Sequence, residues 1–343
     1  MRRLLNTLFV TTEDAYLGLD GENVVAFQGK EELARFPLHT LNGIFAFTYA
    51  GASPALMGAC AKREVNLCFC TPSGRFLARA VGQSSGNVLL RRMQYRCADD
   101  PAVSCRIAKN MVYGKVFNGR WSIRRTMRDH GMRVDLEKLG GASDLLKDAL
   151  PGLLAAESLD SLRGLEGEAA AVYFSALDEM ILNNKEDFYF AGRNRRPPLD
   201  RMNAMLSFVY ALLANDCASA LESAGLDSFV GFLHRDRPGR SSLALDLMEE
   251  LRPCLADRFV LSLVNNRTVK AGDFEERESG AVIMTDAGRK VLVKAWQERK
   301  REEITHPYLK EKMPWGLVPY VQALLLARHL RDDLEEYPPF LWK

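Results

Sequence analysis

The spacing of apolar residues changes near residue 98, and this change divides the chain into two predicted parts. From the start to about residue 95, short apolar runs alternate with turn signals, a pattern typical of strands. Strands are predicted over 4–11, 43–49, 66–70, 76–81 and 88–90, with a short helix over 54–62. Asp20-Gly21 predicts the tight turn of a hairpin over 15–28, because glycine readily adopts the positive φ that such turns need.

From residue 99 onward, apolar residues recur at helical spacing. Helices are predicted over 101–131, 145–154, 161–182, 202–213, 286–301 and, as a last long helix, 305–330, with a break at Gly140-Gly141. Asp200 is expected to cap the helix that follows it, and the aromatic tail 335–343 is expected to dock on the protein. The chain is therefore predicted to be an α+β protein, with an N-terminal β-rich domain over 1–98 and a larger C-terminal all-α domain over 99–343.

Composition indicates the cellular compartment of the protein but says little about its function. The 343 residues carry 46 Lys and Arg against 44 Asp and Glu, so a site for a polyanion must be built from local clusters of cations. The seven cysteines lack the paired spacing of a zinc site, which favours reduced thiols that pack in the core. The start lacks an apolar signal-peptide core, and no apolar run approaches the ~20 residues that span a bilayer. We expect a cytoplasmic protein without a membrane partner.

The stretch 225–253 contains the first candidate chemistry. His234 ends an apolar run, and Asp246 and Glu249 stand three residues apart on a predicted helix, so they share one face. Imidazole and carboxylates near each other suggest a metal site, although such sites normally need three or more donors. The alternative is a histidine with ordinary hydrogen-bond partners beside a solvated acidic helix face. A metal site therefore requires a further donor from elsewhere in the chain.

Glu166 is the candidate for that donor. It lies in the predicted helix 161–182 among Leu162, Leu165 and Ala169, which should form the buried stripe of the helix. A carboxylate on a packed face is costly unless it is paired or bound to a metal. Glu168 points elsewhere and is expected to be solvated. The alternative reading of Glu166 is a surface acid on a helix with irregular periodicity.

Cations cluster in two loops and along one helix. The loop before Pro197-Pro198 and the loop after His234 are rich in arginine, a composition suited to phosphate contacts. The helix 101–131 carries a basic face that either contacts nucleic acid or is merely solvated. The candidate phosphate contacts are Arg193, Arg195, Arg196, Arg235, Arg237, Arg240, Lys109, Lys115, Arg124 and Arg128.

Several segments in order give the chain a family resemblance. RGLEGEAAAVYF, PPLDRMNAMLSFVYALL, GLDSFVGFLH, LDLMEELRP and the later Thr305-His306-Pro307 resemble the CRISPR-associated integrase family, the larger subunit of the spacer-acquisition machinery. The resemblance runs from about residue 110 to the end, and over the β-rich part it is one of architecture. It implies that Glu166, His234 and Glu249 bind Mg²⁺ or Mn²⁺. Asp246 would ligate directly, join through water or orient His234. Many members have Asp where this chain has Glu249.

The same resemblance implies a reaction and partners. The enzyme would join the 3′-OH ends of short foreign DNA fragments (protospacers) to the CRISPR repeat by transesterification, without ATP. The cations named above would hold DNA phosphates. The β-rich domain would form a homodimer, and two dimers would join a small adaptation partner protein in a heterohexamer. Two other functions stay open from the residues alone: a DNA-binding scaffold without catalysis, and a helical interaction subunit whose buried acids are structural.

Overall fold

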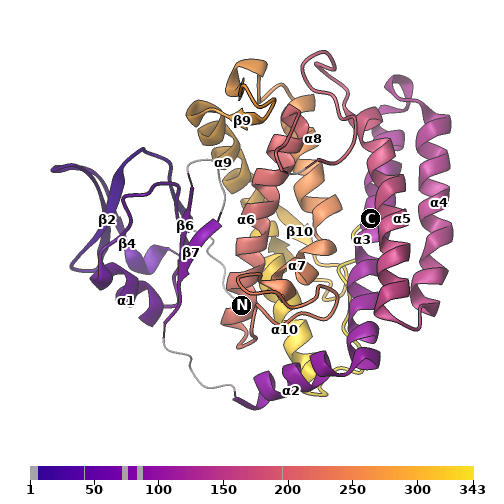
Figure 1. The fold of residues 1–343 in the computed structure, drawn as a ribbon, viewed down its shortest axis with the longest axis horizontal. Coiled ribbons are helices and arrows are strands. Elements are labelled where there is room, and N and C mark those ends of the chain that lie inside the picture. The colour runs from indigo at the N-terminus through magenta and orange to yellow at the C-terminus, as the bar shows by residue number, and fades with distance from the viewer. Residues whose placement is uncertain (1–6, 42, 72–75, 83–87, 195) are drawn as a thin grey trace.

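The N-terminal part is built from two small sheets and one helix. The computed structural model describes residues 7–41, 43–71, 76–82, 88–194 and 196–343 (Figure 1). Within these residues one sheet has the strand order β1-β5-β6-β7 and the other has the order β2-β3-β4. The elements are β1 (Thr7–Val10), β2 (Ala15–Asp20), β3 (Asn23–Gln28), β4 (Glu31–Pro37), β5 (Gly43–Ala46), α1 (Pro54–Lys62), β6 (Asn66–Cys70) and β7 (Phe76–Ala80).

The C-terminal part is mostly helical. Its helices are α2 (Val88–Asp99), α3 (Pro101–His130), α4 (Leu136–Ala155), α5 (Leu159–Leu177), α6 (Arg201–Ser223), α7 (Ser242–Glu249), α8 (Arg258–Asn265), α9 (Asp286–Arg301) and α10 (Val318–Leu330). Two antiparallel ribbons interrupt them, β8 (Phe274–Glu276) with β9 (Val282–Met284) and β10 (Glu303–Thr305) with β11 (Lys312–Pro314). In Figure 1, α3, α4 and α5 form the side of the molecule furthest from the β-rich part. The predicted α+β class is confirmed.

Local sequence signals account for most of these elements. Gly21 has a φ of 58° in the turn between β2 and β3, which confirms the predicted hairpin. Asp200 accepts a hydrogen bond from the backbone N–H of Asn203 at 2.7 Å and caps α6 as predicted. The strand β4 was not predicted, because six of its seven residues are exposed and leave no apolar alternation. The boundary at residue 98 stays a prediction, and α2 runs across it.

Three predicted elements are wrong. The run 88–90 is the first turn of α2 rather than a strand, since three apolar residues do not distinguish the two structures. The helix α4 continues through Gly140-Gly141, because buried Leu139 and Leu146 anchor it on either side of the glycines. The segment 305–330 is helical only from Val318, after a ribbon and a 3₁₀ turn. Glycine weakens a helix without forbidding it, and tertiary packing decides.

The strands β5 and β6 connect the two hydrophobic cores. Alternate residues of a strand face opposite sides of a sheet. Ile44 and Leu67 belong to the smaller core of the N-terminal part, whereas Phe45 and Cys68 belong to the larger core that extends through the helices. Phe47, just after β5, stacks on a phenylalanine of α6 with ring centroids 5.7 Å apart. The sheet therefore packs on α6, and Cys68 is a core residue as predicted.

Helix α6 is the central helix of the larger core. Among the described residues it is the one helix long and apolar enough to cross a membrane, but 78% of its apolar window is buried inside the protein. The expectation that no apolar run approaches the length of a membrane span was therefore wrong for this helix, which was predicted to end at residue 213 but continues to Ser223. Its burial under the β5–β6 sheet and against α7 and α10 explains the apolar composition without a bilayer.

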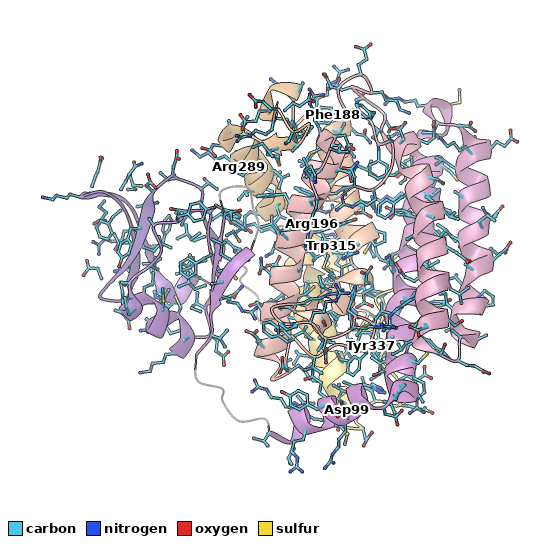
Figure 2. The ribbon with its side chains drawn as sticks, viewed as in Figure 1. Asp99, Phe188, Arg196, Arg289, Trp315 and Tyr337 are labelled. Atoms are coloured by element: carbon cyan, nitrogen blue, oxygen red, sulfur yellow. The ribbon has the colours of Figure 1, made fainter. Side chains whose placement is uncertain are left out.

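The C-terminal tail docks on the protein, as predicted. Tyr337, labelled in Figure 2, donates a hydrogen bond from its hydroxyl to Glu250 Oε1 at 2.5 Å. The backbone N–H of Phe340 donates to Glu250 Oε2 at 2.8 Å. Asn118 of α3 donates to the backbone oxygens of Glu250 and Phe340, both at 2.7 Å. The tail is thereby fixed between α3 and the residue that follows α7.

Candidate metal centre

Three potential metal ligands from separate segments converge between α3, α5 and α7. Glu166 projects from the middle of α5, Glu249 is the last residue of α7, and His234 lies in the loop before α7. The side chain of Glu249 is only 4% exposed, against 24% for Glu166 and 22% for His234. His234 Nε2 lies 4.0 Å from Glu249 Oε1. The structure therefore brings together three of the four predicted ligands at one place.

The fourth, Asp246, holds His234 from inside the protein. Its buried carboxylate accepts hydrogen bonds from the backbone N–H groups of Phe232, Leu233 and His234 at 2.6, 2.9 and 3.0 Å. His234 Nδ1 lies 2.5 Å from Asp246 Oδ1 and donates to it, because an ionised carboxylate only accepts. In its neutral form the imidazole then keeps a lone pair on Nε2, on the side of Glu249. Four contacts occupy Asp246, so its geometry favours orienting His234 over ligating an ion.

Two further residues bring the loop before α7 into place. Gly231 passes so close to α7 that a Cβ atom there would lie 2.7 Å from Asp246 Oδ2, so a side chain would push the loop away. Arg163, one turn before Glu166 on α5, donates to the backbone oxygen of Leu233 at 3.0 and 2.6 Å. Neither residue was predicted from the sequence. The spacing of Arg163 from Glu166 was a usable signal, since residues three apart share a helix face.

Two cationic side chains form ion pairs with the carboxylates of Glu166 and Glu249. Lys115 of α3 forms an ion pair with Glu166 Oε1 and places its Nζ 2.7 Å from Glu249 Oε2. Arg252 places Nη1 2.9 Å from Glu249 Oε1 and its guanidinium 4.9 Å from the ring centroid of Tyr210. Burial raises the pKa of Glu249, but the charges of Arg252 and Lys115 together outweigh burial and hold that pKa at about 2. Glu249 is therefore ionised at neutral pH.

A buried polar cluster supports Arg252. The hydroxyl of Tyr210 donates to Asp257 Oδ1 at 2.5 Å, and both residues lie in the core. Burial raises the pKa of Asp257 to about 6, although the hydrogen bond from Tyr210 opposes that shift. A cavity of about 20 Å³ lies beside this cluster and is also lined by Lys115 and Tyr173. Tyr210 is thus a core residue, and Arg252 is a site residue that was not predicted from the sequence.

The donor set suits a hard divalent cation. Glu249 Oε2 is buried and lies 2.7 Å from the Lys115 ammonium, and such an oxygen is costly to bury unless a cation faces it. Two carboxylates with an imidazole nitrogen suit Mg²⁺ or Mn²⁺ better than a thiolate-seeking ion. In their present positions, however, no three His, Cys, Asp or Glu side chains among the described residues are close enough to hold an ion. Lys115 stands between Glu166 and Glu249.

The predicted phosphate contacts divide into exposed and internal residues. Arg124, Arg128, Arg196, Arg235 and Arg237 are exposed, and Lys109 and Arg240 are half-buried (Figure 2 labels Arg196). Arg193 points into the protein, where its Nη1 donates to Asn203 Oδ1 at 2.6 Å. Lys115 is engaged with the carboxylates, and Arg195 lies outside the described residues. Because Arg193 and Lys115 are engaged in contacts inside the protein, neither is free to contact a phosphate in this conformation. The phosphate contacts of the other residues stay predictions.

Comparison with known proteins places the chain in a family. A model of the family described as CRISPR associated protein Cas1 matches residues 8–298 of the chain. The chain belongs to this Cas1 family. The family resemblance of the sequence segments is therefore confirmed, and the match also covers most of the β-rich part.

Curated relatives cover the whole Cas1 chain. CRISPR-associated endonuclease Cas1 2 of Rhodospirillum rubrum is 50% identical over 348 residues, with 100% of both chains covered. CRISPR-associated endonuclease Cas1 1 of Chlorobaculum tepidum is 50% identical over 343 residues, again with 100% of both covered. Among solved structures, a casposase bound to an integration product has a TM-score of 0.83 at 23% identity. The superposition covers 99% of this chain and 93% of the casposase chain. A CAS1 protein from Thermotoga maritima has a TM-score of 0.82 at 20% identity, with 95% and 97% covered. These structures share the fold.

Proposed function

We propose that this Cas1 chain is a metal-dependent DNA endonuclease and integrase of CRISPR adaptation. It joins the 3′-OH ends of short foreign DNA fragments to the CRISPR repeat by transesterification. The observation that carries the proposal is the convergence of Glu166, His234 and Glu249, with His234 oriented by Asp246. The full-length relatives are named endonucleases, and the casposase neighbour is bound to an integration product, which supports the reaction class.

The chain's own residues prepare the ligands. Glu166, His234 and Glu249 would hold Mg²⁺ or Mn²⁺, and a bound ion polarises a scissile phosphate and favours deprotonation of an attacking hydroxyl. Arg252 keeps Glu249 ionised, and Asp246 keeps the proton of His234 on Nδ1, so both ligands present lone pairs. The fragment's 3′ oxygen forms the new bond to phosphorus, and the repeat's own 3′ oxygen leaves as a hydroxyl. One phosphodiester replaces another, so no nucleotide hydrolysis is required.

Exposed and half-buried cations around the site would hold the DNA. Arg235 and Arg237 lie in the loop that carries His234, and Arg240 follows them before α7. Arg196 lies in the other arginine-rich loop, and Arg124 and Arg128 lie further along α3. Contacts from such side chains to phosphates position the backbone and carry little sequence information. DNA binding is therefore expected to be dependent on salt and mostly independent of sequence.

Partners follow from the same proposal. We infer a homodimer formed through the β-rich domain, and two dimers joined by a small adaptation protein in a heterohexamer. Two structural neighbours come from Cas6-RT-Cas1–Cas2 complexes, which supports a Cas2-type partner. Size-exclusion chromatography with light scattering, on the chain alone and with its partner, tests the assembly.

A strand-transfer assay tests the activity. The reaction contains a short DNA duplex with free 3′-OH ends, a plasmid with the CRISPR repeat, Mn²⁺ or Mg²⁺, and the partner protein. Glu166→Ala, His234→Ala and Glu249→Ala should each abolish joined product while the helical circular-dichroism signal is kept. Glu168→Ala is the matched control, because Glu168 is an exposed carboxylate two residues from Glu166.

Full activity of His234→Ala would show that the ligand assignment is wrong. If all variants and the unmodified chain bind DNA and the partner but transfer no strand with either metal, the chain acts as a scaffold instead.

A further inference from the structure

Lys115 is the side chain that separates the two candidate carboxylate ligands. Its single ammonium contacts Glu166 Oε1 on α5 and lies 2.7 Å from Glu249 Oε2 at the end of α7. The lysine side chain is only 12% exposed, so this bridge is shielded from water. We propose that Lys115 is an internal counter-cation that occupies the metal position and is displaced when the metal binds. This inference rests on the proposed metal site.

The ammonium and a divalent ion compete for the same oxygen. Oxygen ligands lie roughly 2.0 to 2.6 Å from hard divalent ions. Glu249 Oε2 is buried and already lies 2.7 Å from the Lys115 ammonium. An ion on this oxygen would stand within a few ångströms of the lysine nitrogen, where little water screens the repulsion between like charges. Occupancy by one cation therefore excludes the other.

Lys115 is the cation that moves, and Arg252 is the one that stays. An ammonium on a flexible four-carbon stem can rotate away, whereas a planar guanidinium held on two sides cannot. Arg252 is held by Glu249 Oε1 at 2.9 Å and by the ring of Tyr210, and its side chain is 14% exposed. Departure of the lysine thus leaves Glu249 ionised and its Oε2 open.

Displacement makes the metal affinity adjustable. The apparent dissociation constant of the metal equals the intrinsic constant divided by the fraction of molecules in which the lysine is away. A DNA phosphate that pairs with the released ammonium would hold the lysine away and so strengthen metal binding. Lys115 then serves as a positioning residue that links metal loading to the arrival of DNA, which reconciles its internal contacts with its predicted role at phosphates.

The first test measures the exposure of the lysine. The intact protein is acetylated briefly with and without Mn²⁺, and the modified peptides are quantified by mass spectrometry. Acetylation of Lys115 should rise several-fold when Mn²⁺ is present, while Lys147, an exposed lysine on α4, should not change. In Glu249→Gln, which weakens the metal site, Mn²⁺ should no longer raise the labelling. Saturating Mn²⁺ that leaves Lys115 as protected as before would overturn the displacement.

The second test measures affinity. The Kd for Mn²⁺ is determined by electron paramagnetic resonance for the unmodified chain, Lys115→Met and Lys147→Met, which remove the same charge. Lys115→Met should bind Mn²⁺ at least about tenfold more tightly, equivalent to about 1.4 kcal/mol, and Lys147→Met should not. Binding of Mn²⁺ with equal Kd in all three proteins refutes the counter-cation but not the metal site. Absence of binding in all three refutes both, whereas strand transfer tests the function separately.

Discussion

Substitution of Asp246 by Asn tests how the imidazole is oriented. The carboxylate accepts two hydrogen bonds on each oxygen, and an asparagine amide can accept on one side only. If the NH₂ group faces Phe232 and Leu233, two buried N–H donors lose their acceptor. If it faces His234, the imidazole can regain a partner by moving its own proton from Nδ1 to Nε2. That second arrangement puts the proton where the lone pair for the metal should be.

The structure sets the magnitude of the effect. An unsatisfied buried donor costs about 1 to 3 kcal/mol, so one lost backbone partner predicts a loss of roughly that size in the free energy of unfolding. Residues that orient a metal-binding histidine typically contribute about 10- to 100-fold in metal affinity. Asp246→Asn should therefore weaken Mn²⁺ binding and strand transfer by about that factor with a modest loss of stability. Glu249→Gln, by contrast, should abolish both Mn²⁺ binding and strand transfer.

Nitrogen-15 NMR of the imidazole identifies the tautomer. In the unmodified apo protein the proton of His234 should lie on Nδ1, and in Asp246→Asn it should lie on Nε2. Electron paramagnetic resonance gives the Kd for Mn²⁺ of the same samples, and Glu168→Gln controls for the loss of a nearby carboxylate. If Asp246→Asn retains the Nδ1–H tautomer and the Kd of the unmodified chain, Asp246 does not orient His234.

Three further predictions follow from other contacts. Burial lowers the pKa of His306 to about 4, below its usual value near 6.5, so its neutral form favours the folded state. This contribution to the free energy of unfolding is complete above about pH 6.5 and is lost as the pH falls toward 4. The loss amounts to up to about 3 kcal/mol. Urea unfolding of the unmodified protein and of His306→Asn across this pH range measures how much of the pH dependence comes from His306. Tyr337→Phe removes the hydroxyl that contacts Glu250 and Gln322 and should lower the free energy of unfolding by about 1 to 3 kcal/mol, measured by urea unfolding; an unchanged midpoint refutes tail docking as a source of stability. Arg235→Gln with Arg237→Gln should reduce the slope of log K for DNA binding against log salt by about one per lost phosphate contact, measured by fluorescence anisotropy, whereas an unchanged slope removes both residues from the DNA path.

The sequence predicted elements where local patterns and long-range packing agree. The hairpin at Gly21, the helix capped by Asp200 and the continuous helix α3 each have strong local signals. The sequence failed where packing overrode a local pattern. Gly140 and Gly141 stay helical because the neighbouring leucines are buried, and β4 forms although its side chains are exposed. Burial and backbone pairing with distant segments decide these cases, and neither is visible in a short window.

The candidate site divides in the same way. Residue types and spacing pointed to Glu166, His234 and the acids of α7, because such donors stand out among apolar neighbours. Lys115 was placed on a basic helix face, yet the fold turns it toward two carboxylates from other helices. Helical periodicity shows which residues share a face, but it does not show what the face meets. The partner of a charged residue is a property of the assembled core.

Two adjacent residues at the end of α7 show how far the surroundings decide a carboxylate's role. Glu249 and Glu250 are both buried, but they point to different neighbours. Glu249 faces Lys115 and Arg252, and these charges hold its pKa at about 2 despite burial. Glu250 meets Tyr337, Gln322 and the backbone of the tail, all uncharged, so burial raises its pKa to about 7. The same type of side chain thus has two roles: Glu249 is an anion available to a metal, and Glu250 anchors the tail. Because both belong to one turn, contacts that fix the tail also fix the position of Glu249.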